Sequence, residues 1–409
     1  MDTVEEVFRR LPPECLENLK YKLVHYLIRK KVFRPFRAFD KYCQIAFDAT
    51  ELHAWKEEHL GTYKVSNQGY FSITSENLKI LKSRGLPLSI IDHLRKFEGK
   101  KWKGTENFFT AISYLFSKEE WEQWREQLRK YVGNTTWFVF VLEAKLVTSN
   151  GFSISIGSEW IENDQEYDKQ DCESKAFTRL SEKLKKEFPL LPVLVLADGL
   201  YPNQTVLEKC KQLKWMFILV LKDGNLPSVW KEIERAKNLN PEQSANSQSK
   251  QCLQKYYWVN NIEYQKHTIH YGECIETFLN EDFEVKKKNK FAYISNQTLD
   301  QARIQEFIKT GRKRQKIENE GFNIQKNHGF KVKHKISRDA QAYKNWYQCL
   351  QIAHLLCQLM ILAQHFKKWK KQYTFIFLWK FLASALARDS LAEIEIDSLI
   401  NKKIQFRYQ

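Results

Sequence analysis

The chain has 409 residues, with 66 Lys and Arg against 49 Asp and Glu and a formal net charge of +17 at pH 7. Its 43% hydrophobic and 14% aromatic residues supply a packed core, which excludes a chain that is disordered throughout. The positive charge favours an anionic partner, either nucleic acid or an acidic membrane surface. At about 150 residues a domain, the length predicts two to three domains.

The first 30 residues do not resemble a secretory signal, because they begin with acids and have no apolar segment. The longest apolar stretches, 350–362 and 374–387, contain polar side chains and are shorter than the roughly 18 residues of a membrane span. We therefore interpret both as buried helices. The eight cysteines are scattered without a close pair, so neither a structural zinc site nor disulfides are expected.

Taken in chain order, apolar residues at helical spacing predict helices over 3–32, with a new helix starting at the Pro12-Pro13 pair. The run CQIAF (43–47) predicts a short strand that ends at Asp48. Residues 76–132 predict mainly helices, one of which begins with a capping box of Ser117 and Glu120. Because strands precede and follow this block, a helical insertion is predicted over about 55–134.

The second half of the chain predicts alternating strands and helices. Asn150-Gly151 lies between two β-rich runs and indicates a hairpin. The elements that follow are a helix over 170–188, a buried strand over 192–197 ending at Asp198, a helix over 203–213 and a strand over 215–221. A meander followed by βα units is typical of a ribonuclease H-like mixed sheet.

The remaining elements complete the predicted domains. A polar loop over 237–251 and β-like alternation over 255–295 predict a β-rich insertion, about 225–298. From Leu299 the chain is expected to be helical, apart from a strand-like segment at 404–408. The predicted domains are an N-terminal helical region (1–42), a catalytic domain (43–345) that contains both insertions, and a C-terminal helical region (346–409).

A dense basic band over 309–335 contains two carboxylates, Glu318 and Glu320. Acids within such a band suit a protein that holds both a phosphate backbone and a divalent metal ion. Asp48 and Asp198 each follow a predicted strand of one sheet, at the end where ligands gather in open α/β sheets. Structural alternatives are that each Asp opens a turn and that Glu318 forms a surface ion pair with Arg314.

Trp258 lies in the predicted β-rich insertion and has two interpretations. Its ring could stack on an unpaired base of a nucleic acid. Alternatively, it belongs to the hydrophobic core.

Six ordered segments carry a family resemblance, and a seventh, QIAHLLCQL (351–359), continues it. The six are VLEAKLV (141–147), SEWIEN (158–163), KQDCESKAFTRL (169–180), ADGLYPN (197–203), FILVLKDGNLPSVW (217–230) and KIENEGFNIQKNHGFKVKH (316–334). Together they resemble the bacterial insertion-sequence DDE transposases that carry a Tyr-Arg-Glu-Lys signature. The resemblance covers most of residues 137–360 and implies a ribonuclease H-like fold with a β-rich insertion.

The resemblance also implies site residues and cofactors. Asp48, Asp198 and Glu318 would be the catalytic triad and would hold two Mg²⁺ or Mn²⁺ ions. Arg314 and Lys326 would contact the DNA at the transposon end. Further phosphate contacts are expected from the neighbouring cations Arg312, Lys331 and Lys333.

The chain departs from the family pattern in three places. Gly311 stands at the signature Tyr position. Lys326 follows Glu318 by eight residues where the signature has seven, which would fall on Gln325. The stretch between Asp48 and the hairpin is also longer than in the family. Its first part, 55–73, resembles a small DNA-binding module found beside homing endonucleases, and helical packing is the alternative.

The function implied is that of a DNA transposase, an endonuclease that cleaves transposon ends and joins them to target DNA. Its expected partners are double-stranded DNA at terminal inverted repeats and in the target, and a second copy of the chain in a DNA-bound homodimer. No membrane is expected, and the compartment would be the bacterial cytoplasm at the nucleoid. Two alternatives stay open: a catalytically decayed derivative that only binds DNA, and a structure-specific nuclease that uses the same metals.

Overall fold

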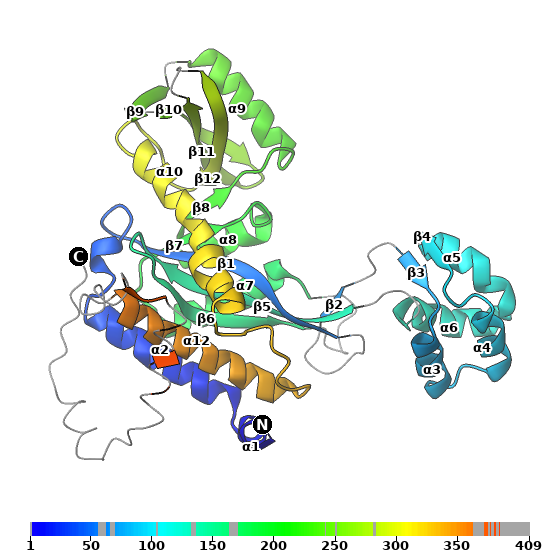
Figure 1. The fold of residues 1–409 in the computed structure, drawn as a ribbon. Coiled ribbons are helices and arrows are strands. Elements are labelled where there is room, and N and C mark those ends of the chain that lie inside the picture. The colour runs from blue at the N-terminus through cyan, green and yellow to red at the C-terminus, as the bar shows by residue number, and fades with distance from the viewer. Residues whose placement is uncertain are drawn as a thin grey trace, which may run out of the picture. The chain divides into compact units, whose positions relative to one another are not determined.

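A computed structural model of the chain describes residues 2–55, 63–65, 70–103, 105–131, 136–162, 171–241, 243–249, 252–280 and 284–362, with a few positions between 372 and 384 (Figure 1). The chain divides into two compact units. The first comprises residues 1–50, 141–160 and 172–409, and the second comprises 51–140 and 161–171. The predicted helical insertion falls mostly in the second unit.

The fold is α/β and is built on a sheet with both parallel and antiparallel strands. This confirms the predicted α/β class and the predicted mixed sheet. Within the described residues the sheet has 10 strands, in the order β2-β5-β1-β7-β8-β12-β11-β10-β9, with β6 paired to β5. The strands are β1 (Cys43–Trp55), β2 (Tyr63–Val65), β5 (Thr136–Val147), β6 (Ser153–Ile161), β7 (Val193–Ala197), β8 (Met216–Val220), β9 (Ser244–Ser249), β10 (Cys252–Tyr264), β11 (His267–Leu279) and β12 (Val285–Ser295).

Three parallel strands, β1, β7 and β8, form the centre of this sheet. All five residues of β7 are buried, as expected for a strand covered on both faces. The helices α7 (Glu173–Glu187) and α8 (Gln204–Leu213) lie before and after β7 in the chain and pack together. The predicted strand–helix–strand order of this region is therefore confirmed, with bounds that differ by a few residues.

The predicted hairpin joins β5 and β6. The Thr148 amide donates to the Phe152 carbonyl at 3.1 Å, and the Gly151 amide donates to the Thr148 carbonyl at 3.4 Å. Gly151 has φ +104°, a conformation that glycine adopts without a steric penalty. The Asn-Gly signal thus marks the turn correctly.

The N-terminal helices pack with a C-terminal helix. One helix ends and the next begins at the predicted proline pair, between α1 (Asp2–Arg10) and α2 (Pro13–Arg29). Both contact α12 (Ala340–Leu362), and the Asn345 amide on α12 donates to the Leu11 carbonyl at the break. Among the described helices, none has a stretch long and apolar enough to cross a membrane. The predicted elements at 374–387 and 404–408 lie largely outside the described residues.

The β-rich region extends the sheet through the pairing of β12 with β8. The polar loop predicted over 237–251 is wrong, because the helix α9 (Pro227–Leu239) and the strand β9 occupy most of it. The strand β9 is held by backbone hydrogen bonds to β10 and has the polar sequence SANSQS. Because this sequence has no apolar alternation, a sequence pattern does not reveal the strand. Helix α10 (Ile304–Arg312) packs across β8, β10, β11 and β12 (Figure 1).

The second unit is mainly helical, as predicted, and has its own apolar core. Its described elements are β3 (Tyr70–Ser72), α3 (Ser75–Ser83), α4 (Leu88–Arg95), β4 (Lys101–Lys103), α5 (Thr105–Ile112) and α6 (Lys118–Tyr131). The core includes Trp102, Phe108 and Trp124. The predicted capping box is confirmed, since Ser117 Oγ accepts from the Glu120 amide at 3.2 Å and Glu120 accepts from the Ser117 amide at 2.8 Å. Much of 55–73 lies outside the described residues.

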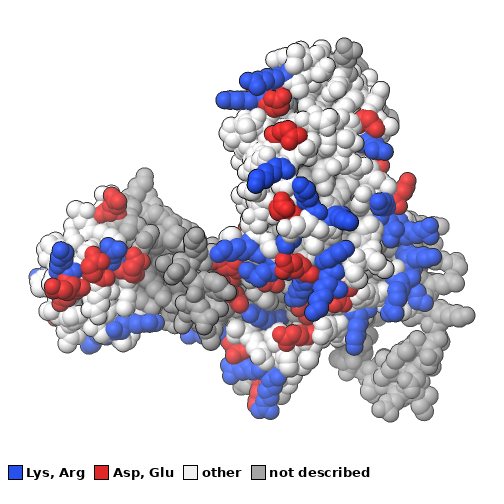
Figure 2. All heavy atoms as spheres, turned by 180° about the vertical axis from the view of Figure 1, so that it is seen from behind, with Lys and Arg blue, Asp and Glu red and all other residues white. Residues whose placement is uncertain are grey.

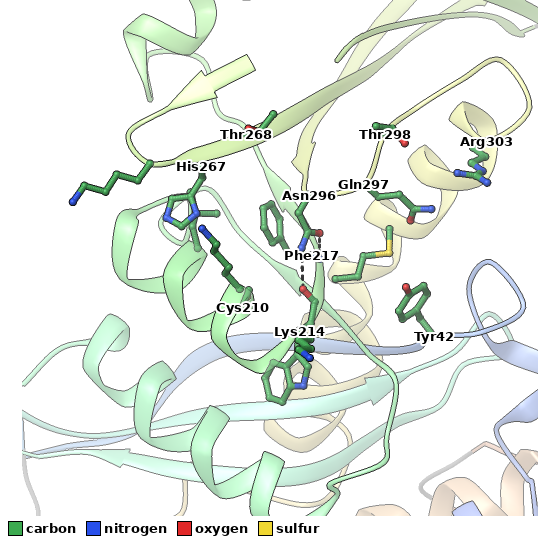
Figure 3. Close-up of a pocket in the computed structure, with 15 residues that line it drawn as sticks. Tyr42, Cys210, Lys214, Phe217, His267, Thr268, Asn296, Gln297, Thr298 and Arg303 are labelled. Carbon is green, nitrogen blue, oxygen red and sulfur yellow. Dashed lines mark hydrogen bonds between the residues drawn. The ribbon is translucent and has the colours of Figure 1, made fainter. Parts of the chain in front are cut away.

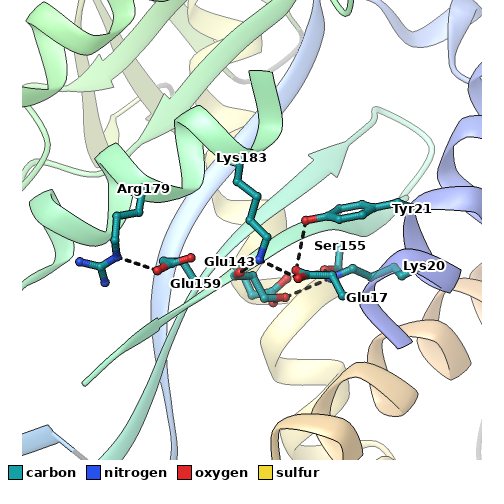
Figure 4. Close-up of polar contacts among 9 residues, drawn as sticks. Glu17, Lys20, Tyr21, Glu143, Ser155, Glu159, Arg179 and Lys183 are labelled. Atoms are coloured by element: carbon teal, nitrogen blue, oxygen red, sulfur yellow. Dashed lines mark hydrogen bonds and ion pairs between the residues drawn. The ribbon is translucent and has the colours of Figure 1, made fainter. Parts of the chain in front are cut away.

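Buried charges fasten helices onto the hairpin (Figure 4). Lys20 of α2 is fully buried and donates to Ser155 and Ser158 of β6, at 3.1 Å each. Ser158 in turn donates to the buried carboxylate of Glu143 on β5. At the helix surface, Lys183 of α7 pairs with Glu17 of α2 at 2.6 Å. A buried charge is tolerated only where partners surround it, so this network specifies how α2 docks on the hairpin.

Candidate active site

Asp48 and Asp198 lie at the same level on neighbouring parallel strands. The pairing of β1 with β7 ends with Ala46 opposite Leu196, and each aspartate is two residues further along its segment. Asp198 directly follows β7, as predicted. Asp48 does not end its strand, which corrects the prediction, because β1 continues to Trp55. It stands where the pairing of β1 with β7 ends.

Asp198 both opens a turn and carries a cationic partner. Its Oδ1 accepts from the Leu200 amide at 2.8 Å, which is the turn-forming role considered as a structural alternative. Its Oδ2 lies 2.9 Å from Lys222 Nζ, which reaches it from the segment after β8. A Cβ on Gly199 would lie 2.6 Å from the Lys222 side chain. Glycine at 199 therefore leaves the space that the lysine stem occupies.

Helical turns after α10 bring Arg314 and Glu318 to the same end of the sheet. Arg314 lies in the turn η3 (Lys313–Gln315), and Lys313 of that turn donates to Gln44 of β1 at 2.8 Å. Arg314 Nη1 lies 3.8 Å from Asp48 Oδ2, and both side chains are 21% exposed. The Arg314 Nε atom is buried and has no hydrogen-bond partner among the described residues. The surface pair of Arg314 with Glu318 is not what the structure shows.

Glu318 is exposed and lies in a π-helical turn, η4 (Ile317–Asn323). Gly321 of this turn packs against the hairpin, since a Cβ there would lie 2.9 Å from Ser153 Oγ and 3.2 Å from Lys145 Cδ. The turn is therefore seated closely on β5 and β6. Single π-turns within helices are frequent at functional sites.

The pKa of Asp48 depends on burial and on the charged groups around this carboxyl. Burial raises the pKa of this carboxyl, Arg314 lowers it, and the charges of Asp198, Glu173 and Glu318 raise it, with a result of about 6. Asp198 and Glu318 are thus near enough to Asp48 to influence its carboxyl. A carboxyl with a pKa raised by burial and by like charges is a common feature of catalytic sites.

Glu173 is a fourth acid at this place that the sequence analysis missed. It begins α7 and accepts a hydrogen bond from the Tyr201 hydroxyl at 3.2 Å. Burial and the charge of Asp198 raise the pKa of the Glu173 carboxyl, while the Tyr201 hydrogen bond lowers it. An acid in the first turn of a helix is ordinary, so no sequence pattern distinguishes Glu173 from a structural residue.

The carboxylate oxygens at this place are chemically suited to bind a divalent cation. Carboxylate oxygens are the ligands that Mg²⁺ prefers, and Asp48 and Asp198 offer a pair of them on adjacent strands. Among the described residues, no three His, Cys, Asp or Glu side chains lie close enough to hold one ion together. A two-carboxylate site completed by water and phosphate oxygens fits this arrangement, whereas a cage of protein ligands does not.

A cavity of about 450 Å³ opens beside Asp198 and Arg314. Lys222 and Lys290 also line it, and Lys290 Nζ lies 3.3 Å from Asp223 Oδ1. On the face drawn in Figure 2, Lys and Arg side chains form clusters with Asp and Glu between them. Lys222 and Lys290 are thus each paired with an acid of the chain.

The other residues predicted to contact DNA differ in their exposure and in their partners. Arg312 pairs with Glu276 at 2.6 Å and lies over the Phe291 ring, whereas Lys331 and Lys333 are exposed. Trp258 is only 8% exposed and belongs to the core cluster. The core interpretation of Trp258 is therefore correct, and its ring does not face a nucleic acid.

Gly311 and Gln325, where the sequence departs from the signature that it resembles, both pack within the fold. Gly311 leaves room for the Tyr293 ring of β12, which would lie 2.9 Å from a Cβ at 311. Gln325 is 1% exposed and donates to Gln351 at 2.8 Å, so it does not reach an external phosphate. Lys326 is partly exposed, with its ammonium over the Phe322 ring.

Comparison of the chain with known protein families finds no family that matches it, and comparison with curated proteins finds no matching protein.

Proposed function

We propose that this chain is a DNA transposase of the DDE type, which cleaves and joins DNA at a site formed by Asp48, Asp198 and Glu318. The observation that carries the proposal is the level placement of the two aspartates on adjacent parallel strands, with Glu318 and Arg314 close enough to change the pKa of Asp48. Acids and a cation at the carboxyl ends of parallel strands suit phosphoryl transfer.

The strand order supports a ribonuclease H-like core. The hairpin strands β6 and β5 lie beside β1, and the parallel strands β7 and β8 follow on its other side. This is the meander followed by βα units that the sequence indicates. The region with β9 to β12 would then be the β-rich insertion between the second aspartate and the glutamate.

The π-turn supports the assignment of Lys326 as the signature lysine. A π-turn accommodates one more residue than an α-helical turn. Glu318 lies within the turn at Ile317–Asn323 and Lys326 follows this turn, so the extra residue of the π-turn offsets a spacing of eight where the signature has seven. The extra residue in the spacing therefore has a structural cause.

The residues have distinct proposed roles. Asp48 and Asp198, joined by Glu318, would hold two Mg²⁺ or Mn²⁺ ions, which when bound activate the attacking oxygen and stabilise the leaving oxygen. Arg314 would exchange its 3.8 Å contact with Asp48 for a bidentate contact with a DNA phosphate. Lys326, Lys331 and Lys333 would add affinity that does not depend on sequence and that falls with salt. The partners would be transposon-end and target DNA, bound by a homodimer.

One observation favours the alternative of a DNA-binding derivative without catalysis. Lys222 contacts Asp198, Arg314 contacts Asp48, and no three acids lie within reach of one ion among the described residues. A decayed site would keep such internal ion pairs permanently. An active site would exchange them for metal ions and phosphates when DNA binds.

Nicking of supercoiled plasmid DNA in Mg²⁺ or Mn²⁺ tests the proposal, because it requires no knowledge of the terminal repeats. The wild type should nick the plasmid, and Asp198→Asn should abolish nicking while retaining affinity for a fluorescent duplex. Asp92→Asn, an exposed aspartate on α4, is the matched charge control. Binding without nicking in the wild type would favour the decayed derivative, and nicking by Asp198→Asn at the wild-type rate would contradict the proposed site.

A further inference from the structure

A second cavity, of about 750 Å³, lies at the amino ends of the parallel strands, the end opposite to Asp48 and Asp198 (Figure 3). Tyr42, which lines it, directly precedes β1, and Trp215 directly precedes β8. The other lining residues come from the end of α8, the β10–β11 turn and the segment after β12. The cavity is therefore formed by one unit of the chain and is separate from the candidate active site.

The cavity is lined by cations and by no acid. Lys211, Lys214, Lys266 and Arg303 line it, and none of its lining residues is an Asp or Glu. Arg303 has a distant partner in Asp300, at 3.8 Å. For the three lysines, no ion pair is found among the described residues. Four cations around one cavity produce a positive potential that favours an anion.

The backbone at Lys214 is in an unfavourable conformation for lysine. Lys214 ends α8 with φ +55°, and its amide bonds back to the Cys210 carbonyl. Glycine is the usual residue at this left-handed position because it has no Cβ. Lysine at this position costs about 1 kcal/mol relative to glycine.

One residue of the cavity wall already has an acidic partner. His267 is 8% exposed, and its Nε2 lies 3.5 Å from Glu208 Oε2. The polar atoms Trp215 Nε1 and Gln297 Oε1 are buried beneath the surface, so a ligand in the cavity does not reach them. The cations that line the cavity are therefore the groups that can contact an anion.

We propose that this cavity binds a nucleoside 5′-monophosphate unit, with its phosphate at the lysines. The volume lies within the range of small-molecule sites. A single inorganic phosphate would leave most of it unfilled, whereas Tyr42, Met216 and Phe217 offer an apolar wall to a base. The unit is either a free nucleotide or the 5′-phosphorylated end of a DNA strand.

Isothermal titration calorimetry on the full chain tests the proposal, with thymidine 5′-monophosphate, thymidine and inorganic phosphate as probes. The nucleotide should bind more tightly than either part alone. A second pair of probes, an oligothymidylate octamer with and without a 5′-phosphate, separates the two sources. Preference for the phosphorylated octamer over the mononucleotide identifies a strand end, and the reverse preference identifies a free nucleotide.

Lys214→Gly separates binding from folding, because glycine suits the backbone at 214 and should leave the fold at least as stable. It should weaken nucleotide binding roughly tenfold, the loss expected for one charge-assisted contact. Lys231→Gln, an exposed lysine on α9, is the control. Equal binding by Lys214→Gly and the wild type, equal affinity for thymidine and its monophosphate, or no binding of any probe would each overturn the proposal.

Discussion

Replacement of Asp48 by Asn should stabilise the protein while removing a proposed catalytic group. In the folded chain, burial and the neighbouring acids raise the pKa of this carboxyl from its ordinary value of 3.8 to about 6. The folded state therefore binds the proton more tightly than the unfolded state. The resulting stability is fully present below pH 3.8 and is lost as the pH rises through 6. Two pH units at about 1.4 kcal/mol each give a loss of about 3 kcal/mol at pH 8.

Urea unfolding followed by tryptophan fluorescence measures this loss. Near pH 4, Asp48→Asn and the wild type should have similar free energies of unfolding, because Asn mimics the protonated carboxyl. By pH 8 the variant should be more stable by up to about 3 kcal/mol. Asp92→Asn, at an exposed position, should show no such widening gap. If Asp48→Asn is less stable than the wild type at pH 8, the reasoning about burial and clustered acids is refuted.

Three further substitutions test the packing around the site. Lys145→Met should flatten the rise in stability that the wild type shows above pH 8 in urea unfolding, because burial lowers the pKa of Lys145 to about 8. Gly321→Ala should destabilise the fold by about 1–3 kcal/mol in the same assay, since its Cβ meets Ser153. Gly199→Ala should change stability little, but its crystal structure should show Lys222 displaced from Asp198.

The sequence predicts the parallel centre of the sheet well because its strands are short apolar runs. The run PVLVLA and the acid after it locate β7 and Asp198 within a residue. The end of β1 is predicted less well, since the strand continues through residues of mixed polarity to Trp55. Its other neighbour, β5, accounts for the continuation, and pairing between distant strands is not visible in a local pattern.

The sequence singles out candidate acids but not the contacts that they make. Asp48, Asp198 and Glu318 lie where electrostatics links them, yet Glu173 has no distinguishing signal in the sequence. The π-turn contains Gly321, which packs against the hairpin, and such a tertiary contact is not visible in a local sequence pattern. Charge runs likewise do not show which cations are already paired, as Arg312 is with Glu276.

Binding of Mn²⁺, followed by electron paramagnetic resonance, tests the central claim most directly. Wild-type protein should bind Mn²⁺, and each of Asp48→Asn, Asp198→Asn and Glu318→Gln should weaken that binding, with DNA present to complete the ligand set. Asp92→Asn should bind as the wild type does. Mn²⁺ binding that is absent from the wild type, or that is unchanged in all three variants, would contradict a shared metal site at these carboxylates.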